Sequence, residues 1–171
     1  VPLCGKSLDM HWLKQLGHTV VGIELVEKAI KQFFDDASAL ALQESKQTGT
    51  KYSAENIHLY HADFFKVQPD EMPVEAWYDR AALVALPSTM RQAYVEQLLN
   101  LTTKDSKGLM VTFDYPQEEM QGPPFALPDS EVESLFSQHF TVERVQWTDV
   151  LEGEQRDLTR CSLSVFVLTR R

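Results

Sequence analysis

The start of the chain constrains the fold more than any other stretch. An apolar run stops at Gly5, a helical pattern follows and closes at Gly17, and a second apolar run, 18–23, ends on Glu24. This is the order strand, glycine turn, helix, strand, carboxylate. It is typical of a βαβ unit, in which two parallel strands are joined by a helix. We therefore predict an α/β fold that begins with such a unit.

The spacing of this unit indicates a nucleotide site. Gly5 and Glu24 lie 24 − 5 = 19 residues apart, close to the roughly 20 residues between a nucleotide-binding glycine turn and the carboxylate that binds a ribose. A fixed carboxylate can accept hydrogen bonds from both ribose hydroxyls, and a glycine lets the backbone approach a ligand without a Cβ in the way.

Other interpretations of the same residues stay open. The turn has one glycine, not the three of a dinucleotide fingerprint. The tripeptide Gly5-Lys6-Ser7 hints at a phosphate-binding loop, but no glycine precedes it within the apolar run. A plain βαβ unit with a tight turn and a solvent-facing Glu24 is the remaining alternative.

Motifs along most of the chain resemble one family. They are Pro2-Leu3-Cys4-Gly5-Lys6-Ser7, Gly22-Ile23-Glu24, Tyr78-Asp79-Arg80-Ala81-Ala82-Leu83, Asp114-Tyr115 and Gly122-Pro123-Pro124-Phe125. In this order they resemble the thiopurine S-methyltransferase family, most strongly in the first 25 residues and around Arg80. The resemblance implies S-adenosylmethionine (SAM) as cofactor and a class I methyltransferase fold.

The predicted architecture is a doubly wound, Rossmann-like, seven-stranded and mostly parallel sheet with an antiparallel last strand. We expect residues 1–171 to form a single methyltransferase domain. Because the chain opens on Val1 inside a strand that should be central and longer, we also expect an N-terminal segment to be missing. In the resembling family that segment is a helix that covers the cofactor.

The remaining elements follow from periodicity and turn residues. The expected elements are a helix over 26–43, a polar insertion loop over 45–55, strands over 56–61 and 76–79, a helix opening at 86–88, a strand over 108–115, a helix over 129–137, and an antiparallel hairpin of 141–148 with 161–169.

Candidate cofactor residues lie at strand ends, where doubly wound sheets bind ligands. Leu3 and Gly5 are expected to line the methionine and sugar side, with Glu24 on the ribose. The resemblance places Asp63 and Phe64 at the adenine, where a carboxylate can accept from the exocyclic amine and a ring can pack on the base. The alternative for Asp63 is a cap on a short helical turn.

The candidate substrate residues come from the second half of the chain. The resemblance assigns Arg80 to the site, near cofactor and substrate, although Arg80 could instead form a structural salt bridge with Asp79 or Asp63. Phe125 follows two prolines and is expected either to wall an aromatic substrate or to anchor its loop. The family has a second arginine near the substrate, which Arg156, Arg160 or neither could match.

Composition excludes several classes of function. A net charge of −9 argues against binding a nucleic-acid backbone or an anionic membrane surface. No apolar run is long enough to span a bilayer, and no Cys or His cluster has the spacing of a metal site. Cys4 and Cys161 do not suggest a disulfide scaffold. We expect a monomeric cytoplasmic protein that takes a small molecule and no metal.

The predicted function is SAM-dependent methyl transfer to an aromatic or heterocyclic thiol, with Arg80 orienting the acceptor. Such thiols are largely ionised near neutral pH, so a general base is not required. One alternative is a methyltransferase of the same fold that acts on selenium or tellurium oxyanions or on small thiols. Another is a non-catalytic nucleotide-binding module or a nicotinamide-dependent oxidoreductase, although the single glycine disfavours nicotinamide binding.

Overall fold

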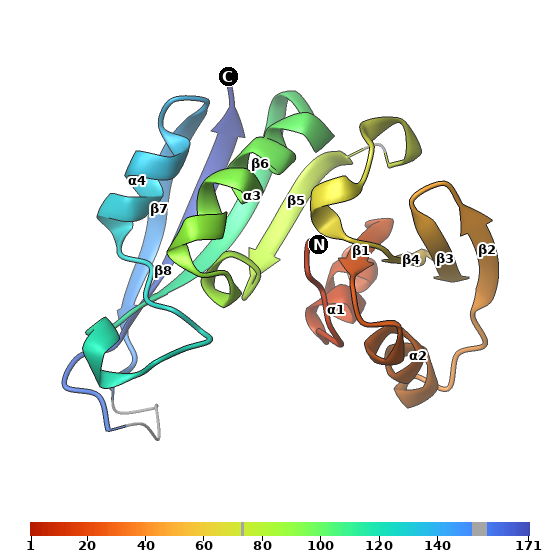
Figure 1. Cartoon of the computed structure of the whole chain (residues 1–171), viewed down its shortest axis with the longest axis horizontal. Helices are drawn as coiled ribbons and strands as arrows, with labels where there is room; N and C mark the ends of the chain where they lie inside the picture. The colour runs from red at the N-terminus through yellow and green to blue at the C-terminus, as the bar shows by residue number, and fades with distance from the viewer. Residues whose placement is uncertain (73, 152–156) are drawn as a thin grey trace. The chain divides into compact units, whose positions relative to one another are not determined.

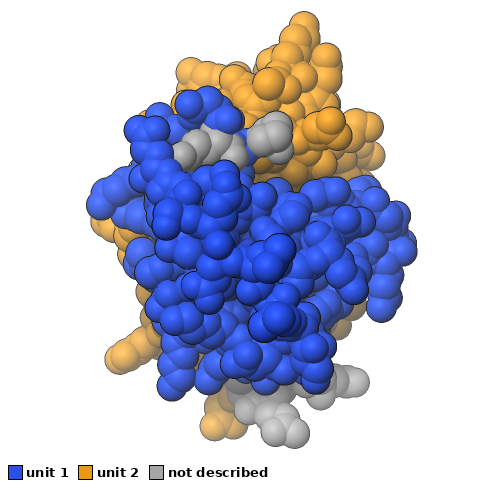
Figure 2. Space-filling model, turned by 90° about the vertical axis from the view of Figure 1, so that its right-hand side faces the viewer, with its two compact units in different colours: residues 1–72 blue, residues 73–171 orange. Residues whose placement is uncertain are grey.

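The computed structural model describes residues 1–72, 74–151 and 157–171 (Figure 1). The chain divides into two compact units, residues 1–72 and residues 73–171 (Figure 2). Each unit has its own four-stranded sheet. The two units are described separately below.

The first unit is a mixed sheet with two helices. Its elements are α1 (Asp9–Gln15), β1 (Val20–Glu24), α2 (Glu27–Asp36), β2 (Leu42–Lys46), β3 (Gly49–Ala54) and β4 (Ile57–His61), followed by the 3₁₀ turns η1 (Phe64–Lys66) and η2 (Pro69–Glu71). The strand order is β1-β4-β3-β2. β1 and β4 are parallel, with Glu24 opposite His61, so both strands end at the same edge of the sheet.

The extended segment before the first helix lies beside β1. The Val1 amine donates to the Val21 carbonyl at 2.7 Å, and Ile23 N donates to Val1 O at 3.1 Å. Cys4 N then donates to Ile23 O at 3.0 Å. This is the alternation of a parallel ladder. The predicted first strand is therefore present as a hydrogen-bonded segment, although it is too short to be assigned as a strand.

The prediction for residues 26–55 was correct only for the first part of the helix. Helix α2 ends at Asp36, and the expected insertion loop is instead an antiparallel hairpin of β2 and β3 that extends the sheet beyond β4. The sequence pattern did not predict this hairpin because its residues are largely polar: β2 is an exposed edge strand whose side chains face water. Tyr52 fixes the hairpin, since its ring is buried and its hydroxyl donates to Glu27 on α2.

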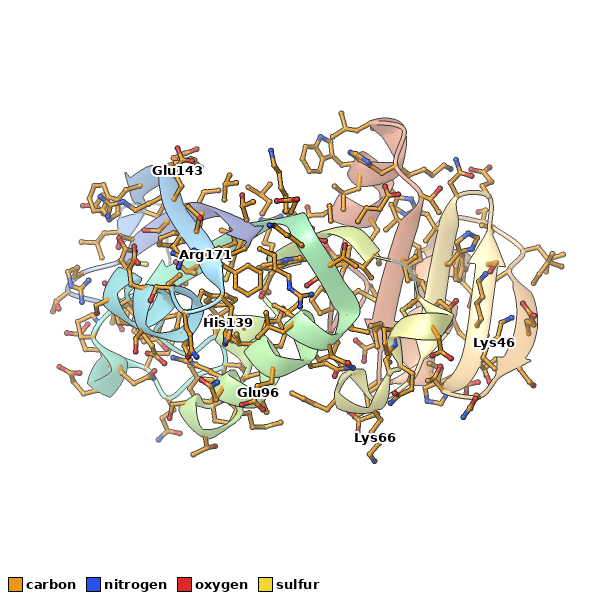
Figure 3. All side chains as sticks on the ribbon, turned by 90° about the horizontal axis from the view of Figure 1, so that it is seen from above. Lys46, Lys66, Glu96, His139, Glu143 and Arg171 are labelled. Carbon is orange, nitrogen blue, oxygen red and sulfur yellow. The ribbon has the colours of Figure 1, made fainter. Side chains whose placement is uncertain are left out.

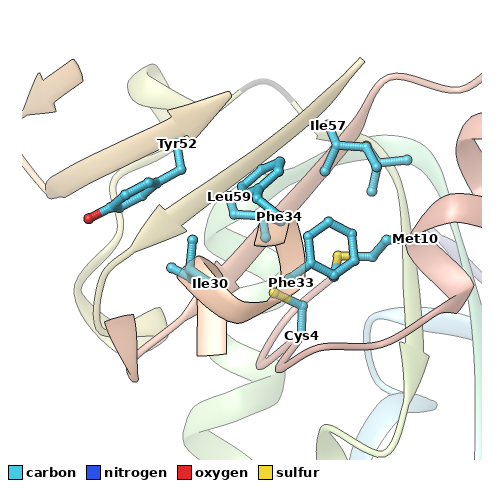
Figure 4. Packing of buried hydrophobic residues seen from close by; sticks show 9 residues of the cluster. Cys4, Met10, Ile30, Phe33, Phe34, Tyr52, Ile57 and Leu59 are labelled. Carbon is cyan, nitrogen blue, oxygen red and sulfur yellow. The ribbon is translucent and has the colours of Figure 1, made fainter. Parts of the chain in front are cut away.

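The core of the first unit forms where α2 packs against the sheet (Figure 4). It contains Cys4, Met10, Val20, Ile30, Phe33, Phe34, Tyr52, Ile57 and Leu59. Gly22 in β1 is required by this packing, because a Cβ there would lie 2.6 Å from Leu59 Cδ2 and 2.7 Å from Cys4 Sγ. The glycine turn at Gly5 and the Glu24 carboxylate are thus attached to a closely packed core.

The second unit also has a mixed sheet. Its elements are β5 (Val74–Arg80), η3 (Leu83–Ala85), α3 (Ser88–Leu101), β6 (Thr102–Asp114), η4 (Gln117–Glu119), α4 (Asp129–Phe136), β7 (Phe140–Asp149) and β8 (Ser162–Arg170). The order is β5-β6-β8-β7, with β5 parallel to β6 and β8 antiparallel to both of its neighbours. The predicted hairpin and antiparallel last strand are confirmed.

Aromatic side chains from β5, α4 and β7 pack against one another in the second unit. The Trp77 ring stacks near Phe136 with centroids 6.2 Å apart, and Phe140 meets Trp77 edge-on. Gly108 on β6 leaves room for the indole, since a Cβ there would lie 2.0 Å from Trp77 Cε2. Charged residues such as Glu96 on α3 and Glu143 on β7 stand on the exposed surface (Figure 3).

The single seven-stranded, mostly parallel sheet needs correction. Within the described residues the hydrogen-bonded strands form two four-stranded mixed sheets, in which only β1–β4 and β5–β6 are parallel pairs. The β2–β3 hairpin adds antiparallel pairing that the sequence pattern did not reveal, and residues 1–4 do not count as a strand. The α/β class itself is correct. In the described part of the chain, no helix has both the length and the apolar character needed to cross a membrane.

Candidate active site

Glu24 lies at the carboxyl end of β1 and is fixed by two backbone donors. Its Oε2 accepts from Gly5 N at 2.9 Å, and its Oε1 accepts from Val26 N at 2.7 Å. The first contact joins Gly5 and Glu24, the two residues whose 19-residue spacing indicated a nucleotide site. Each carboxylate oxygen has a further lone pair. The carboxylate is therefore held in place while keeping two acceptor positions, the number that two ribose hydroxyls need.

The turn opposite Glu24 has an unusual backbone. Leu3 has φ of 46° and Gly5 has φ of 51°, both in the left-handed region. A Cβ built on Gly5 would have no heavy atom within 4 Å, so open space borders the turn. Leu3 is half-buried beside it. Because the fixed carboxylate faces a bare backbone turn, the residues present fit the ribose of a nucleotide-like cofactor.

Asp63 stands near Glu24 because β4 runs beside β1. Ala62 N donates to Glu24 O at 3.1 Å, which brings the residues after β4 to the same edge of the sheet. Asp63 caps η1, its Oδ1 accepting from Phe65 N at 3.1 Å, and Lys66 Nζ lies 3.3 Å from its Oδ2. The capping alternative is thus observed, and an adenine contact through the remaining lone pairs stays a prediction.

The two aromatic residues after Asp63 differ in exposure. Phe64 is 4 % exposed, and Phe65, which meets it edge-on, is half-buried. Little of the Phe64 ring is therefore accessible to a base. Sequence reasoning missed Phe65, because adjacent aromatic residues in a turn give no periodic signal that separates the inward ring from the outward one.

In the second unit, β5 ends with a buried acid followed by an exposed base. Asp79 is 1 % exposed and Arg80 is exposed, as expected for successive residues of a strand, whose side chains point to opposite faces. The Asp79 carboxylate accepts from Ala82 N at 2.8 Å and from Tyr94 Oη at 2.8 Å. Leu83 N also donates to it, at 3.2 and 3.3 Å.

Burial dominates the electrostatics of this cluster. Loss of solvation raises the pKa of the Asp79 carboxyl, although its hydrogen bonds to Tyr94 and to the two backbone amides act in the opposite direction. Burial, together with the nearby carboxylate, also raises the pKa of the Tyr94 hydroxyl. Tyr94 therefore stays protonated and acts as a donor. The sequence showed it only as an apolar-face residue of α3.

Phe125 lies on a loop that returns to the end of β5. Its backbone N–H donates to Val84 O at 2.6 Å, which ties the loop to η3. A Cβ on Gly122 would lie 2.6 Å from the half-buried Phe125 ring, so the ring covers that glycine. Tyr115 Oη donates to Pro124 O at 2.6 Å. The loop is thus anchored through the Phe125 backbone, and both roles of the Phe125 side chain, loop anchor and substrate wall, stay predictions.

A buried arginine that the sequence did not single out supports the same loop. Arg91 is 3 % exposed, and its guanidinium donates to Leu86 O at 3.3 Å, Ala126 O at 3.0 Å and Glu131 Oε1 at 2.7 Å. These contacts join the start of α3, the Phe125 loop and the first turn of α4. A cation buried with three acceptors is satisfied and rigid.

The two candidates for a second substrate arginine have different outcomes. Arg156 lies outside the described residues. Arg160 forms an ion pair with Asp114 at the carboxyl end of β6, and this pairing raises the pKa of its guanidinium. Thr159 beside it donates to Glu119 through its backbone N–H at 2.7 Å. Arg160 is therefore held near the end of β6 by a contact that the sequence did not indicate.

Comparison with solved structures identifies the fold. The chain is similar to the N-methyltransferase NodS from Bradyrhizobium japonicum in complex with S-adenosylhomocysteine, with a TM-score of 0.66, 10% identity, and coverage of 99% of this chain and 75% of that one. It is also similar to the Burkholderia thailandensis 1,6-didemethyltoxoflavin-N1-methyltransferase, with a TM-score of 0.65, 14% identity, and coverage of 99% and 68%. The fold is that of class I SAM-dependent methyltransferases.

Sequence comparison then gives the family. The family model for thiopurine S-methyltransferase matches residues 1–171. Proteins named thiopurine S-methyltransferase from Shewanella woodyi and Shewanella oneidensis are 44% and 42% identical, over all of this chain and 81% of each relative. One from Xanthomonas campestris is 39% identical over 99% of this chain and 80% of the relative. The chain belongs to the thiopurine S-methyltransferase family, and it is a SAM-dependent methyltransferase.

Proposed function

We propose that this enzyme transfers the methyl group of SAM to the sulfur of an aromatic or heterocyclic thiol. The observation that carries the proposal is the match along the whole chain to relatives named thiopurine S-methyltransferase. The same match, which extends through both compact units, supports a single methyltransferase domain.

We assign cofactor binding to the edge of the first sheet. The fixed Glu24 carboxylate would accept from the ribose hydroxyls, and the Leu3–Gly5 turn would line the sugar and methionine side. Asp63 and Phe64 would face the adenine, with the half-buried Phe65 beside them. When bound, SAM supplies a methyl group already activated by a positive sulfur.

We assign the acceptor to the end of β5. Arg80 is an exposed guanidinium that stays positively charged, so it can hold an anionic thiolate by charge and hydrogen bonds. It can also contact the cofactor. A thiolate is already a nucleophile and needs no proton removed, which leaves positioning as the main task. Holding reactants in line can contribute about 7–11 kcal/mol. Arg80 is thus a substrate-orienting residue and not a proton donor.

We assign one wall of the acceptor site to the Phe125 loop of the second unit. Phe125 presents an aromatic ring that is anchored at its backbone, and its exposed part can pack on a flat heterocycle. Arg156 is proposed as a second cation near the acceptor by resemblance to the family. The enzyme is proposed to act as a monomer on a small molecule.

Calorimetric titration with S-adenosylhomocysteine, with NADH as the control, tests the cofactor site. Micromolar binding of S-adenosylhomocysteine alone is expected. Methylation of thiophenol and a mercaptopurine, compared with selenite, tellurite and small aliphatic thiols, then tests the acceptor. Faster turnover of selenite or tellurite than of the aromatic thiols would refute the thiol assignment without affecting the cofactor assignment.

Substitution tests the role of Arg80. Arg80→Met keeps much of the side-chain length without the charge, and Arg80→Lys keeps a charge without the planar fork. Both should lower kcat/KM for a thiol more than they weaken S-adenosylhomocysteine binding. Full activity of Arg80→Met would remove Arg80 from the acceptor site.

A further inference from the structure

Asp79, the residue before Arg80 in β5, is buried, and its carboxylate accepts a hydrogen bond from the buried Tyr94. We propose that Asp79 and Tyr94 are positioning residues that set the direction of the Arg80 side chain, an inference that rests on the proposed role of Arg80 in holding the acceptor. Neither residue is accessible enough to bind an acceptor, since Asp79 is 1 % exposed and Tyr94 is fully buried. Their effect on the reaction must therefore pass through the backbone.

The backbone around Arg80 has a conformation that requires support. Ala81 follows it with φ of 91°, in a region that residues with a Cβ rarely adopt. A non-glycine residue persists there only when surrounding contacts enforce it. The chain bends at this residue, directly after Arg80, which is the last residue of β5 and pairs with Val111 of β6. The direction of Arg80 is therefore set on one side by the sheet and on the other by the turn.

Hydrogen bonds to the Asp79 carboxylate hold the turn in this conformation. The carboxylate precedes the turn and accepts from Ala82 N at 2.8 Å and from Leu83 N at 3.2 and 3.3 Å, on the far side of Arg80 and Ala81. The bond to Ala82 N closes a loop that encloses Arg80 and Ala81, and the bonds to Leu83 N reinforce it one residue further on. Because the carboxylate is buried, water cannot replace it as the acceptor for the two N–H groups.

Tyr94 fixes the carboxylate in turn. Its hydroxyl donates to Asp79 Oδ2 at 2.8 Å from α3, a 14-residue helix whose Tyr94, Val95 and Leu98 are buried. A carboxylate held only by the turn could rotate with it. A carboxylate also held by a packed helix cannot, so the turn takes its orientation from α3. The tyrosine ring contributes packing and its hydroxyl contributes orientation.

Removal of the hydroxyl alone separates these two contributions. Tyr94→Phe retains the ring and deletes the bond to Asp79. We expect kcat/KM for thiophenol to fall about tenfold, while the Kd for S-adenosylhomocysteine stays within about twofold of wild type. Tyr52→Phe is the matched control, because it deletes a buried hydroxyl that also donates to a carboxylate, Glu27, in the first unit. It should leave kcat/KM for thiophenol unchanged.

A double-mutant cycle decides whether the effect passes through Arg80. If Tyr94 positions Arg80, adding Tyr94→Phe to Arg80→Met causes little further loss. If the two losses multiply, Tyr94 acts independently and the inference is wrong. If Arg80→Met alone retains full kcat/KM, the proposed role of Arg80 fails, and the inference fails with it. If Arg80→Met is impaired but Tyr94→Phe is not, only the positioning role is refuted.

Asp79→Asn tests the same hydrogen bond from its acceptor side. The amide oxygen can still accept from the turn, but the NH₂ group cannot accept from Tyr94. At best it donates to Tyr94 Oη, so a charge-assisted bond to α3 is replaced by a weaker neutral one while the turn keeps one acceptor. The same pattern as for Tyr94→Phe is expected: a fall in kcat/KM for thiophenol with a near-constant Kd for S-adenosylhomocysteine. A folded Asp79→Asn variant with wild-type kcat/KM would overturn the inference.

Discussion

Glu24→Gln is the most informative substitution in the cofactor site, because it preserves shape and changes only hydrogen bonding and charge. In the native protein the two carboxylate oxygens accept from Gly5 N and Val26 N, at 2.9 and 2.7 Å. An amide has one oxygen. One of the two backbone N–H groups must therefore face an NH₂ donor, and the amide offers one acceptor position to the ribose where the carboxylate offers two.

The size of the effect follows from these bonds. A hydrogen bond to a charged group contributes about 1.5–3 kcal/mol, and the lower end applies because the site is partly exposed. Loss of one backbone bond then costs about 1.5 kcal/mol of stability, which corresponds to a fall in Tm of roughly 3–6 °C for a chain of this length. Loss of one ribose contact likewise costs about 1.5 kcal/mol of binding, or roughly tenfold in Kd.

Calorimetry with S-adenosylhomocysteine measures the binding loss, and thermal unfolding measures the stability loss. Glu24→Ala should weaken binding at least about tenfold as well. Glu44→Gln is the control, since Glu44 is an exposed acid of β2 that pairs with Lys46. It should change neither quantity. A lowered Tm with unchanged Kd in Glu24→Gln would show that Glu24 only braces the turn, and unchanged values of both would refute the whole account of this residue.

Three further predictions concern packing, thiol reactivity and the acceptor wall. Gly108→Ala should lower the free energy of unfolding by about 1–3 kcal/mol or more, because its Cβ would overlap the Trp77 indole; an unchanged Tm would contradict this. Cys4 and Cys161 are buried, and burial raises the pKa of the Cys4 thiol to about 12. Ellman's reagent should therefore detect neither thiol in the native protein at neutral pH and both in guanidinium, and rapid native reaction would refute the burial. Phe125→Ala should raise KM for thiophenol without weakening S-adenosylhomocysteine binding, and an unchanged KM would leave Phe125 as a loop anchor alone.

The features predicted from sequence were those set by local pattern. The order strand, turn, helix, strand placed Gly5 and Glu24 correctly, because a short βαβ connection leaves the two strands parallel and adjacent. The last two strands were also predicted, from the alternation of Leu163, Val165 and Val167 in the sequence, and residues 162–169 of β8 do alternate between buried and half-buried. In both cases the periodicity of a few consecutive residues carries the structural information.

The features that were missed depend on contacts between distant residues. The β2–β3 hairpin is largely polar. Its strands form because β3 pairs through its backbone with β4 and β2 pairs with β3, rather than because one face is apolar. The bond between Asp79 and Tyr94 joins residues 15 apart and exists only where α3 crosses β5. Arg91 resembles any polar helix residue in the sequence, but three acceptors from separate segments surround it.

Carboxylates near the ends of three strands make the same kind of contact with a neighbouring turn, but they differ in exposure. Glu24, Asp63 and Asp79 each end or follow a strand, and each accepts from backbone N–H groups of a nearby turn. Their exposure differs: Glu24 is half-buried, the Asp63 side chain is 34 % exposed, and Asp79 is 1 % exposed. A carboxylate with exposed lone pairs can hold a turn and a ligand together. A fully buried one is not accessible to a ligand, so in our proposal Asp79 acts on the reaction through the residue that precedes the turn, Arg80.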